Sequence, residues 1–589
     1  MMLAPPKPRT RKLTIIAQDP SIKVDGKILM TEVDVPAEEF APGPRGYRAH
    51  VIDYDTSTGT LYVSLQYDPL KDGQYLDPFK ERAARANNES LVSDPQFHQQ
   101  NVYAIVMRTL ARFEFALGRR VGWGFHGHQL SIAPHAFADA NAFYSEQDQA
   151  LVFGYFRGVS GKIVFSCLSH DVVAHETTHA LLDGLRQRYT DPSSPEQAGF
   201  HEGFSDVVAL LSVFSLREIV GILLTSSQSR GNPEAPDLID PKELTVEKLR
   251  ESVLLGLAKE MGHEMAGVRG NRANALRRSV KLRPFDDAQK YGEEFDEPHR
   301  RGEILVAAIL NSFLEVWKKR IDRLKHGRIS GSMLDLETVV EEGANAADQL
   351  LTMAIRALDY APPTDLQFCD YLSALITADK EVAPDDSKYG YRSILIANFA
   401  RYGIKPPTSA NADGSWKMFD KAVTYDRSHF ESMLRDPDEV FRFIWENRGD
   451  EALDLDDRAY TKVISVRPCL RIGPDGFTLR ETVAEYIQML TLRAEELEIY
   501  FDPPINIPDG MDEHQEVTLY GGGALIFDEY GHVKYHINNR INNANRQSPR
   551  LEYLWKYGYF DDKSETENVF ARMHLQRALD LPTTASEEF

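Results

Sequence analysis

The sequence predicts an α+β fold, because strand-like and helix-like patterns occupy different parts of the chain. The first 75 residues alternate apolar and polar side chains in stretches such as RKLTIIAQD and ILMTEVDV, separated by turns rich in Pro, Gly and Asp. Beyond residue 96, apolar residues recur three and four apart over long segments. A chain of 589 residues is long enough for about two to four domains.

The order of these patterns divides the chain into three expected parts. Residues 1–80 are predicted to form a small β domain, a meander of short strands. Residues 81–405 are predicted to form the main domain, with strands and loops in its early part. The helical spacing in this domain covers residues 96–117, 168–188, 197–217, 302–320, 335–358 and 389–403.

A stretch rich in turn residues, RYGIKPPTSANADGSW, marks a boundary near residue 405. Residues 406–589 are predicted to form a C-terminal α/β domain: a strand at KVISVRPCLRI, a helix at TLRETVAEYIQMLTLRAEELE, and a hairpin in GGGALIFDEYGHVKYHI that turns at DEYGH. The three glycines at 521–523 are a weak phosphate-loop candidate, because neither a lysine nor the start of a helix follows them.

Charge and composition exclude several classes of function. A formal net charge of −22 argues against nucleic acid or an anionic membrane as the main partner. No apolar run approaches the length that spans a bilayer, and the first residues lack the apolar segment of a secretory signal. Three scattered cysteines without CxxC spacing are typical of free thiols in a reducing compartment. We therefore expect a cytoplasmic protein.

The segment DVVAHETTHALLDGL contains two histidines, His175 and His179, with Glu176 directly after the first. On a helix, residues four apart lie on one face, one turn apart, so both imidazoles can bind one metal ion. Glu176 is rotated by about 100° from His175 and can hold a water molecule beside that ion. The motif favours one catalytic zinc ion over three polar residues on an ordinary helix.

A catalytic zinc ion needs a third protein ligand, and two glutamates are candidates. Glu196 lies in the loop TDPSSPEQAG, where nothing fixes the direction of its side chain. Glu202 lies in the helical pattern HEGFSDVVALL, with Asp206 four residues later on the same face. An aspartate there can accept the outer N–H of a zinc-bound histidine. Glu202 is therefore the preferred ligand, and Asp206 its supporting carboxylate.

Three other histidines lie near these motifs. His201 directly precedes Glu202 and is a candidate to orient a ligand histidine. His126 and His128 in FHGHQ alternate as they would on one face of a strand, which makes them a weaker candidate for a second metal site.

The two segments DVVAHETTHALLDGL and HEGFSDVVALL together resemble the thermolysin-like zinc peptidases, which are gluzincins. The resemblance extends over about residues 90–405. It implies a two-lobed core, with a zinc-bearing lobe at 81–215 and a helical lobe at 216–405. It also implies a calcium-stabilised fold, but the residues after the third-ligand helix, VVALLSVFSLREIV, are mostly apolar, so calcium is doubtful here.

The resemblance also implies roles for residues outside the metal motif. Glu176 would be the general base, and the family's two oxyanion donors would correspond to His299 and Tyr189. The acidic residues beside His299 that could orient it are Glu294, Asp296 and Glu297. Two arginines, Arg277 and Arg283, remain open as the substrate-binding arginine.

The segment NAFY resembles the family's edge strand, whose Asn and Ala bind the backbone of the substrate. By that resemblance Asn141 and Ala142 bind an extended peptide. The leading hypothesis is thus a zinc endopeptidase acting on peptides or proteins, whose activity is controlled by its N- and C-terminal domains. The alternatives are a catalytically silent binding scaffold and, less favoured because no GxMEN-like segment is present, an aminopeptidase.

Overall fold

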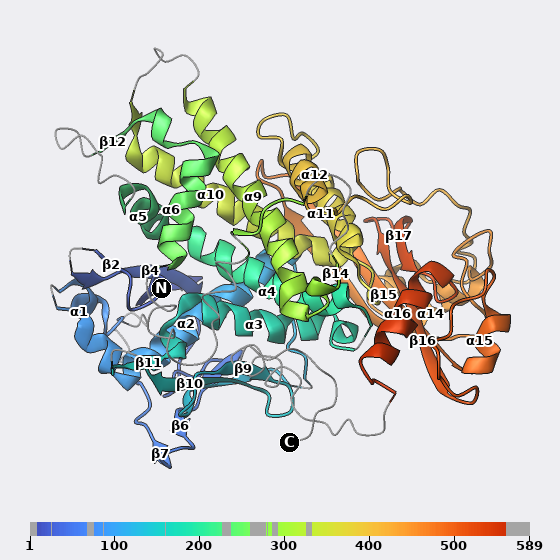
Figure 1. Cartoon of the computed structure of the whole chain (residues 1–589), viewed down its shortest axis with the longest axis horizontal. Coiled ribbons are helices and arrows are strands. Elements are labelled where there is room, and N and C mark those ends of the chain that lie inside the picture. Colours follow the sequence, from blue (N-terminus) through green and yellow to red (C-terminus); the bar gives the residue numbers. More distant parts are fainter. Residues whose placement is uncertain are drawn as a thin grey trace, which may run out of the picture.

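The structure is a computed structural model that combines helices and strands, as the α+β prediction requires. It describes residues 9–24, 26–67, 76–85, 87–125, 127–158, 161–191, 193–226, 237–258, 279, 281–285, 292–325 and 333–560. Figure 1 shows the N-terminal strands at one end, the C-terminal sheet at the other, and most of the helices between them.

The main sheet of the N-terminal half has the strand order β11-β10-β8-β5. Its strands are β5 (Ala49–Val51), β8 (Leu130–Phe137), β10 (Ala150–Arg157) and β11 (Ile163–Phe165). β8 is parallel to both β5 and β10, whereas β11 is antiparallel to β10. A short strand, β9 (Ala142–Ser145), pairs antiparallel with β10 and has no other strand partner among the described residues.

All six helices expected within residues 81–405 are present in the structure. They are α2 (Pro95–Leu117), α3 (His170–Leu185), α4 (Pro195–Phe214), α9 (Pro298–Leu324), α10 (Leu336–Arg356) and α12 (Tyr391–Arg401). A further helix, α11 (Phe368–Val382), lies between α10 and α12 in the chain.

Local signals explain where several of these helices begin and end. The Asp94 side chain accepts a hydrogen bond from the backbone of Gln96 at the start of α2, and the left-handed Gly118 ends that helix. Ser194 caps α4 in the same way. None of the described helices is long and apolar enough to cross a bilayer by itself. The segments Pro195–Phe214 and Arg217–Thr225 meet the length and composition criteria only as a pair bent by 78°.

The N-terminal residues do not form the meander expected for them. β1 (Thr10–Ile16) pairs antiparallel with β4 (Met30–Pro36), but β5 leaves this pair and lies parallel to β8 in the main sheet. The remaining strands form two short hairpins, β2 (Lys23–Val24) with β3 (Lys27–Ile28) and β6 (Tyr54–Asp55) with β7 (Thr60–Leu61). The period-2 pattern locates strands but not their partners, which depend on contacts across more than 80 residues. The buried residues of β1 and β4 share one core with α2 and α3.

The C-terminal part contains a four-stranded antiparallel sheet, β14-β15-β16-β17. Its strands are β14 (Tyr460–Ile472), β15 (Thr478–Arg493), β16 (Glu516–Phe527) and β17 (Val533–Asn539). The helix expected at residues 478–498 was wrong for most of its length, because β15 occupies it and only α15 (Ala494–Tyr500) is helical.

The error at β15 has a physical reason. Residues 481–488 are buried without interruption, because β15 lies between β14 and β16 and is covered on both faces. A strand buried on both sides loses its period of two, and apolar residues three or four apart then resemble a helix. The β-branched residues Thr482, Val483 and Ile487 favour the strand.

The hairpin expected at the end of the sheet is confirmed, since β16 and β17 pair on either side of the turn at 528–532. The three glycines lie inside β16 rather than in a loop. A Cβ on Gly521 would lie 2.6 Å from the backbone nitrogen of Ile541, and one on Gly522 would lie 2.4 Å from the Tyr486 carbonyl oxygen. Close packing against neighbouring backbone therefore accounts for these two glycines.

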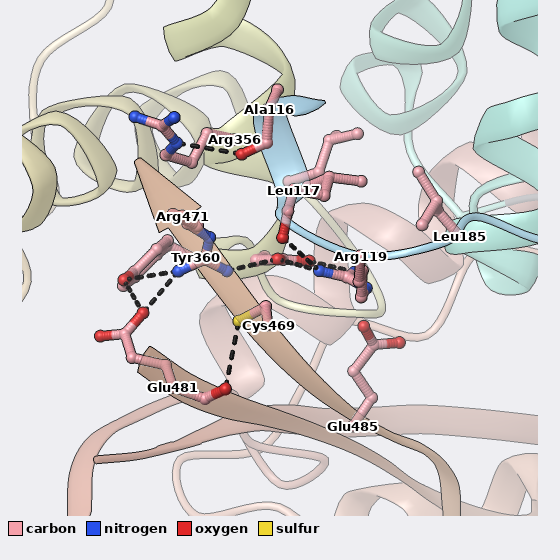
Figure 2. Close-up of polar contacts among 12 residues, drawn as sticks. Ala116, Leu117, Arg119, Leu185, Arg356, Tyr360, Cys469, Arg471, Glu481 and Glu485 are labelled. Atoms are coloured by element: carbon pink, nitrogen blue, oxygen red, sulfur yellow. Dashed lines mark hydrogen bonds and ion pairs between the residues drawn. The ribbon is translucent and has the colours of Figure 1, made fainter. Parts of the chain in front are cut away.

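The C-terminal sheet meets the helical region through a buried network of charges (Figure 2). Arg471 on β14 bonds Asp359 at 2.5 Å and also Glu481 on β15 at 2.5 Å. Asp359 in addition accepts hydrogen bonds from Arg119, which follows α2. Next to this network Arg186, at the end of α3, forms an ion pair with Glu485 of β15. The sheet is thus joined to two separate segments of the main domain, at Asp359 and at Arg186, by buried ion pairs.

Replacing Asp359 with Asn should destabilise the protein strongly. Its carboxylate is only 1% exposed and serves two buried guanidinium groups, which the neutral amide cannot balance. We expect the free energy of unfolding in urea to fall by about 3–5 kcal/mol.

The control for this substitution is Asp457→Asn. Asp457 also forms an ion pair, with Arg448 at 3.0 Å, but its side chain is 70% exposed. The exposed pair should contribute less than about 1 kcal/mol. Equal losses in the two variants would contradict a structural role for the buried network.

Candidate metal centre

Two histidines of α3 form the core of the site. Successive turns of the helix bring His175 and His179 together, with their Nε2 atoms 2.9 Å apart. The helix is fixed by the burial of its apolar face, which includes Val173, Leu181 and Leu182. Both histidines are themselves buried, so their direction is set by packing rather than by solvent. The expected i, i+4 pairing is therefore present in the structure.

Glu202 of α4 completes a triangle with these histidines. Its carboxylate oxygens lie 3.6 Å from the Nε2 atoms of His175 and His179. Ligands of a tetrahedral zinc ion, each at about 2.0–2.1 Å, lie roughly 3.3 Å from one another. Two imidazoles and a carboxylate at these separations fit such an ion.

The other candidate for the third ligand lies elsewhere. The Glu196 carboxylate accepts a hydrogen bond of 2.7 Å from the backbone N–H of Phe368, at the start of α11. Of the two glutamates considered from the sequence, the structure brings Glu202 to the histidine pair.

The outer nitrogens of both histidines have partners. The Nδ1 atom of His175 lies 2.8 Å from Asp206, the carboxylate expected for this purpose. The Nδ1 atom of His179 lies 2.7 Å from Nδ1 of His201 and 3.3 Å from the Ser205 hydroxyl. Such outer contacts fix which nitrogen carries the proton and direct the other nitrogen inward.

Charge complementarity within the cluster shifts two pKa values. Burial lowers the pKa of His175, but the carboxylates of Asp206, Glu202 and Glu176 together outweigh burial and raise that pKa to about 9. Burial raises the pKa of Glu202, but the charges of His299 and His179 outweigh it and hold that pKa well below its usual range. The site therefore keeps Glu202 ionised, which is the form that binds a cation.

Glu176 lies on α3 directly after His175 and is fully buried. Its charge is one of the factors that raise the pKa of His175. This is the position expected for a group that handles a proton beside the metal ligands.

His299 approaches the site from the first turn of α9. Its Nε2 lies 3.2 Å from Glu202, and its Nδ1 lies 2.5 Å from Glu297. Glu297 is also the N-cap of α9, accepting from the backbone N–H of Arg300 at 2.8 Å. Asp296 instead pairs with Arg301. The carboxylate that orients His299, which the sequence left open among three, is thus Glu297.

Tyr189 is the second residue expected as an oxyanion donor. Its side chain is buried, and its hydroxyl donates a 2.7 Å hydrogen bond to the backbone carbonyl of Pro362. Its ring packs edge-on against Phe200. A hydroxyl bonded to a buried carbonyl serves the packing of this loop, and the catalytic role expected for Tyr189 stays a prediction.

The segment NAFY lies beside the metal-site helix. The hydroxyl of Tyr144 in β9 donates to Asp183 of α3 at 3.0 Å, which ties the strand to the helix. The side chain of Asn141 accepts from the backbone N–H of Ala142 at 2.9 Å, and its carbonyl accepts from Gly154 at 2.8 Å. The strand β9 is thus joined to the helix that carries the two histidines.

Four further residues were considered from the sequence. Arg277 and His126 lie outside the described residues. Arg283 and His128 are exposed.

A backbone contact between α4 and α9, which the sequence did not reveal, sets the distance between Glu202 and His299. A Cβ on Gly302 would lie 2.8 Å from the backbone nitrogen of Gly203 and 2.9 Å from the carbonyl oxygen of Gly199. Gly203 directly follows Glu202, and Gly302 lies one turn after His299. The two helices therefore touch at the level of the site, and only glycine permits that approach.

Neither the protein-family models nor the curated proteins that were searched give a match to this chain. The arrangement of the side chains is therefore the basis for any statement about function.

We expect Gly302→Ala to disrupt the site. The added methyl group must push α9 away from α4, since the atoms it meets belong to the backbone and cannot rotate away. Overpacking of this kind costs about 1–3 kcal/mol, measured as the free energy of unfolding in urea. The affinity for zinc should fall as well, measured by competition with a chromophoric chelator.

A matched control is Gly221→Ala in α5 (Arg217–Ser226), where the nearest neighbour of the new Cβ is a Val340 methyl group at 3.9 Å. This variant should keep the wild-type affinity for zinc. Wild-type stability and metal affinity in Gly302→Ala would show that the helices can separate without cost.

Proposed function

We propose that this protein is a zinc-dependent endopeptidase with a thermolysin-like, two-lobed core. The observation that carries the proposal is the convergence of His175, His179 and Glu202, whose ligand atoms all lie within 4.8 Å of one another. The three ligands come from the zinc-bearing lobe at 81–215, and His299 comes from the helical lobe at 216–405.

Zinc bound by these residues supplies Lewis acidity, which polarises a peptide carbonyl and makes a water molecule acidic enough to react near neutral pH. Asp206 and His201 hold the outer nitrogens of the two histidines, so that each presents its Nε2 lone pair to the ion.

Glu176 is assigned as the general base. Its carboxylate takes a proton from the attacking water molecule and returns it to the departing amine nitrogen. Because Glu176 is buried beside His175, its distance from the reacting atoms is set by α3 itself. No other residue of the HETTH motif offers a carboxylate for this step.

His299 is assigned as a donor to the oxygen that becomes negative when the carbonyl is attacked. Glu297 holds its Nδ1 proton, and the Nε2 atom points into the site toward Glu202. Two adjacent carboxylates favour the doubly protonated imidazole, which can donate from both nitrogens. A preorganised donor of this kind stabilises the transition state more than the ground state.

The substrate is assigned to the strand β9. We expect an extended peptide to lie along this strand, with Ala142 at its start and Asn141 directly before it. Because β9 is tied to α3 through Tyr144 and Asp183, a peptide bound there lies beside the metal ligands.

Replacing Glu176 with Gln should abolish most of the peptidase activity and leave zinc in place. The amide keeps the size of the side chain but cannot accept the proton, so the rate of peptide cleavage should fall by about 10²–10⁴-fold. Zinc content measured by atomic emission should equal that of the wild type. Cleavage of no peptide from a diverse library by the zinc-loaded wild type would favour a silent binding scaffold instead.

Replacing Glu202 with Ala should release zinc, because two histidines alone leave the ion without its only anionic ligand in this cluster. Zinc affinity is measured by titration against a chelator. The control is Glu196→Ala on the same helix, whose carboxylate contacts α11 and which should keep both the metal and the activity. Full zinc occupancy of this site in Glu202→Ala would exclude Glu202 as a ligand.

A further inference from the structure

A second cluster of metal-binding side chains lies inside the N-terminal half of the protein. It consists of His98 on α2, His135 on β8 and Cys167 in the short 3-10 helix η2 (Ser166–Leu168). Their ligand atoms also lie within 4.8 Å of one another, and all three side chains are buried. Since these residues come from three distant parts of the sequence, only the fold brings them together.

The outer nitrogens of both histidines have acceptors. The Nε2 atom of His98 lies 2.9 Å from the carbonyl oxygen of Val92, and the Nδ1 atom of His135 lies 2.8 Å from the Asp53 carboxylate. The other oxygen of Asp53 accepts from the Gln99 amide at 2.8 Å, which fixes its direction. Carbonyl and carboxylate oxygens only accept, so both of these nitrogens carry protons.

This proton assignment decides what the inner nitrogens can do. Nδ1 of His98 faces Nε2 of His135 at 2.7 Å. If both rings are neutral, both inner nitrogens carry lone pairs, and two lone pairs repel at that distance. Either a hydrogen atom or a metal ion must therefore lie between the two inner nitrogens.

The third member of the cluster distinguishes between these two possibilities. A shared proton would satisfy the two imidazoles without any sulfur atom, whereas the Cys167 sulfur lies within 4.8 Å of a ring nitrogen of each histidine, where a metal ion would bind it as a thiolate. Two imidazoles and one thiolate are a donor set that zinc prefers. The charges also balance, because one thiolate and the Asp53 carboxylate together neutralise a divalent cation.

The surroundings exclude water from the cluster. The ring centroid of Phe165 lies 4.7 Å from that of His98 and 5.3 Å from that of His135. The ring centroid of Tyr62 lies 5.0 Å from that of His135. A hydrophobic shell with an outer carboxylate on one ligand histidine is typical of protein zinc sites.

We propose that His98, His135 and Cys167 hold a second, structural zinc ion. This ion would bind α2 and β8 to η2, which ends two residues before α3 begins. It thereby fixes the start of the helix that carries His175 and His179. The segment around Cys167 is also held by Asn101, whose side-chain amide donates to the Cys167 carbonyl at 2.9 Å.

Cobalt substitution of the full-length protein tests this site separately from the first one. The cluster of His175, His179 and Glu202 contains no sulfur, so a sulfur-to-cobalt charge-transfer band in the near ultraviolet reports on a cysteine alone. We expect the apo protein to develop this band when Co²⁺ is added, and Cys167→Ser to lose it. The remaining cysteines provide matched controls: Cys369→Ser and Cys469→Ser should keep the band.

The test holds even if Cys167→Ser fails to fold, which circular dichroism would detect. The wild-type measurement is then decisive, together with Glu202→Ala, which should lose the first ion and keep the sulfur band. A wild-type protein that binds Co²⁺ without the band would overturn the proposal and assign a shared proton to the histidine pair. Loss of the band in Cys369→Ser or Cys469→Ser, with Cys167→Ser unchanged, would overturn it as well.

Discussion

The contact between the backbones of α4 and α9 is the constraint on which the candidate metal centre depends. At Gly203 and Gly302 the helices approach so closely that a single methyl group on either would meet backbone atoms at 2.8 Å. Glu202 is next to the first glycine, and His299 is one turn before the second. The packing of the two helices therefore sets the distance of 3.2 Å between His299 Nε2 and the Glu202 carboxylate, and side-chain rotation can change it little. Loops of any length can connect the two helices, provided that this contact forms.

The C-terminal sheet fixes the other end of the metal-site helix. α3 ends at Leu185, and the next residue, Arg186, directs its guanidinium to Glu485 on β15 and to the carbonyl of Leu358. A buried guanidinium deprived of its carboxylate is costly, so the end of α3 and the sheet stabilise each other. Asp359 is stabilised in the same way, because its buried carboxylate pairs with Arg471 of the sheet. Among the described residues, the C-terminal sheet thus contacts the end of α3 through Glu485, which pairs with Arg186.

How much the sequence could predict depends on how far apart along the chain the interacting residues lie. Spacing within one helix predicted the pairing of His175 with His179 and the placing of Asp206 one turn after Glu202, because helix geometry alone determines which residues share a face. The strand β15 was mistaken for a helix because burial on both faces removes the alternation that identifies a strand. Tyr189 was assigned by its distance along the chain, but packing against Phe200 and Pro362 determines where its hydroxyl points.

The two histidine clusters illustrate the same limit and share one physical logic. In each, an aspartate holds the outer Nδ1 of a histidine at 2.8 Å, and the inner nitrogens of two histidines face each other at 2.7–2.9 Å. In one cluster the aspartate, Asp206, lies four residues from a candidate ligand on the same helix, so a local pattern reveals it. In the other, Asp53 lies more than 80 residues before its histidine, and the sheet pairing of β5 with β8 brings the two segments together. β5, which pairs with β8 instead of joining the expected N-terminal meander, is therefore the strand that brings Asp53 close to His135. A metal ligand set becomes readable from sequence only when one secondary-structure element holds most of it.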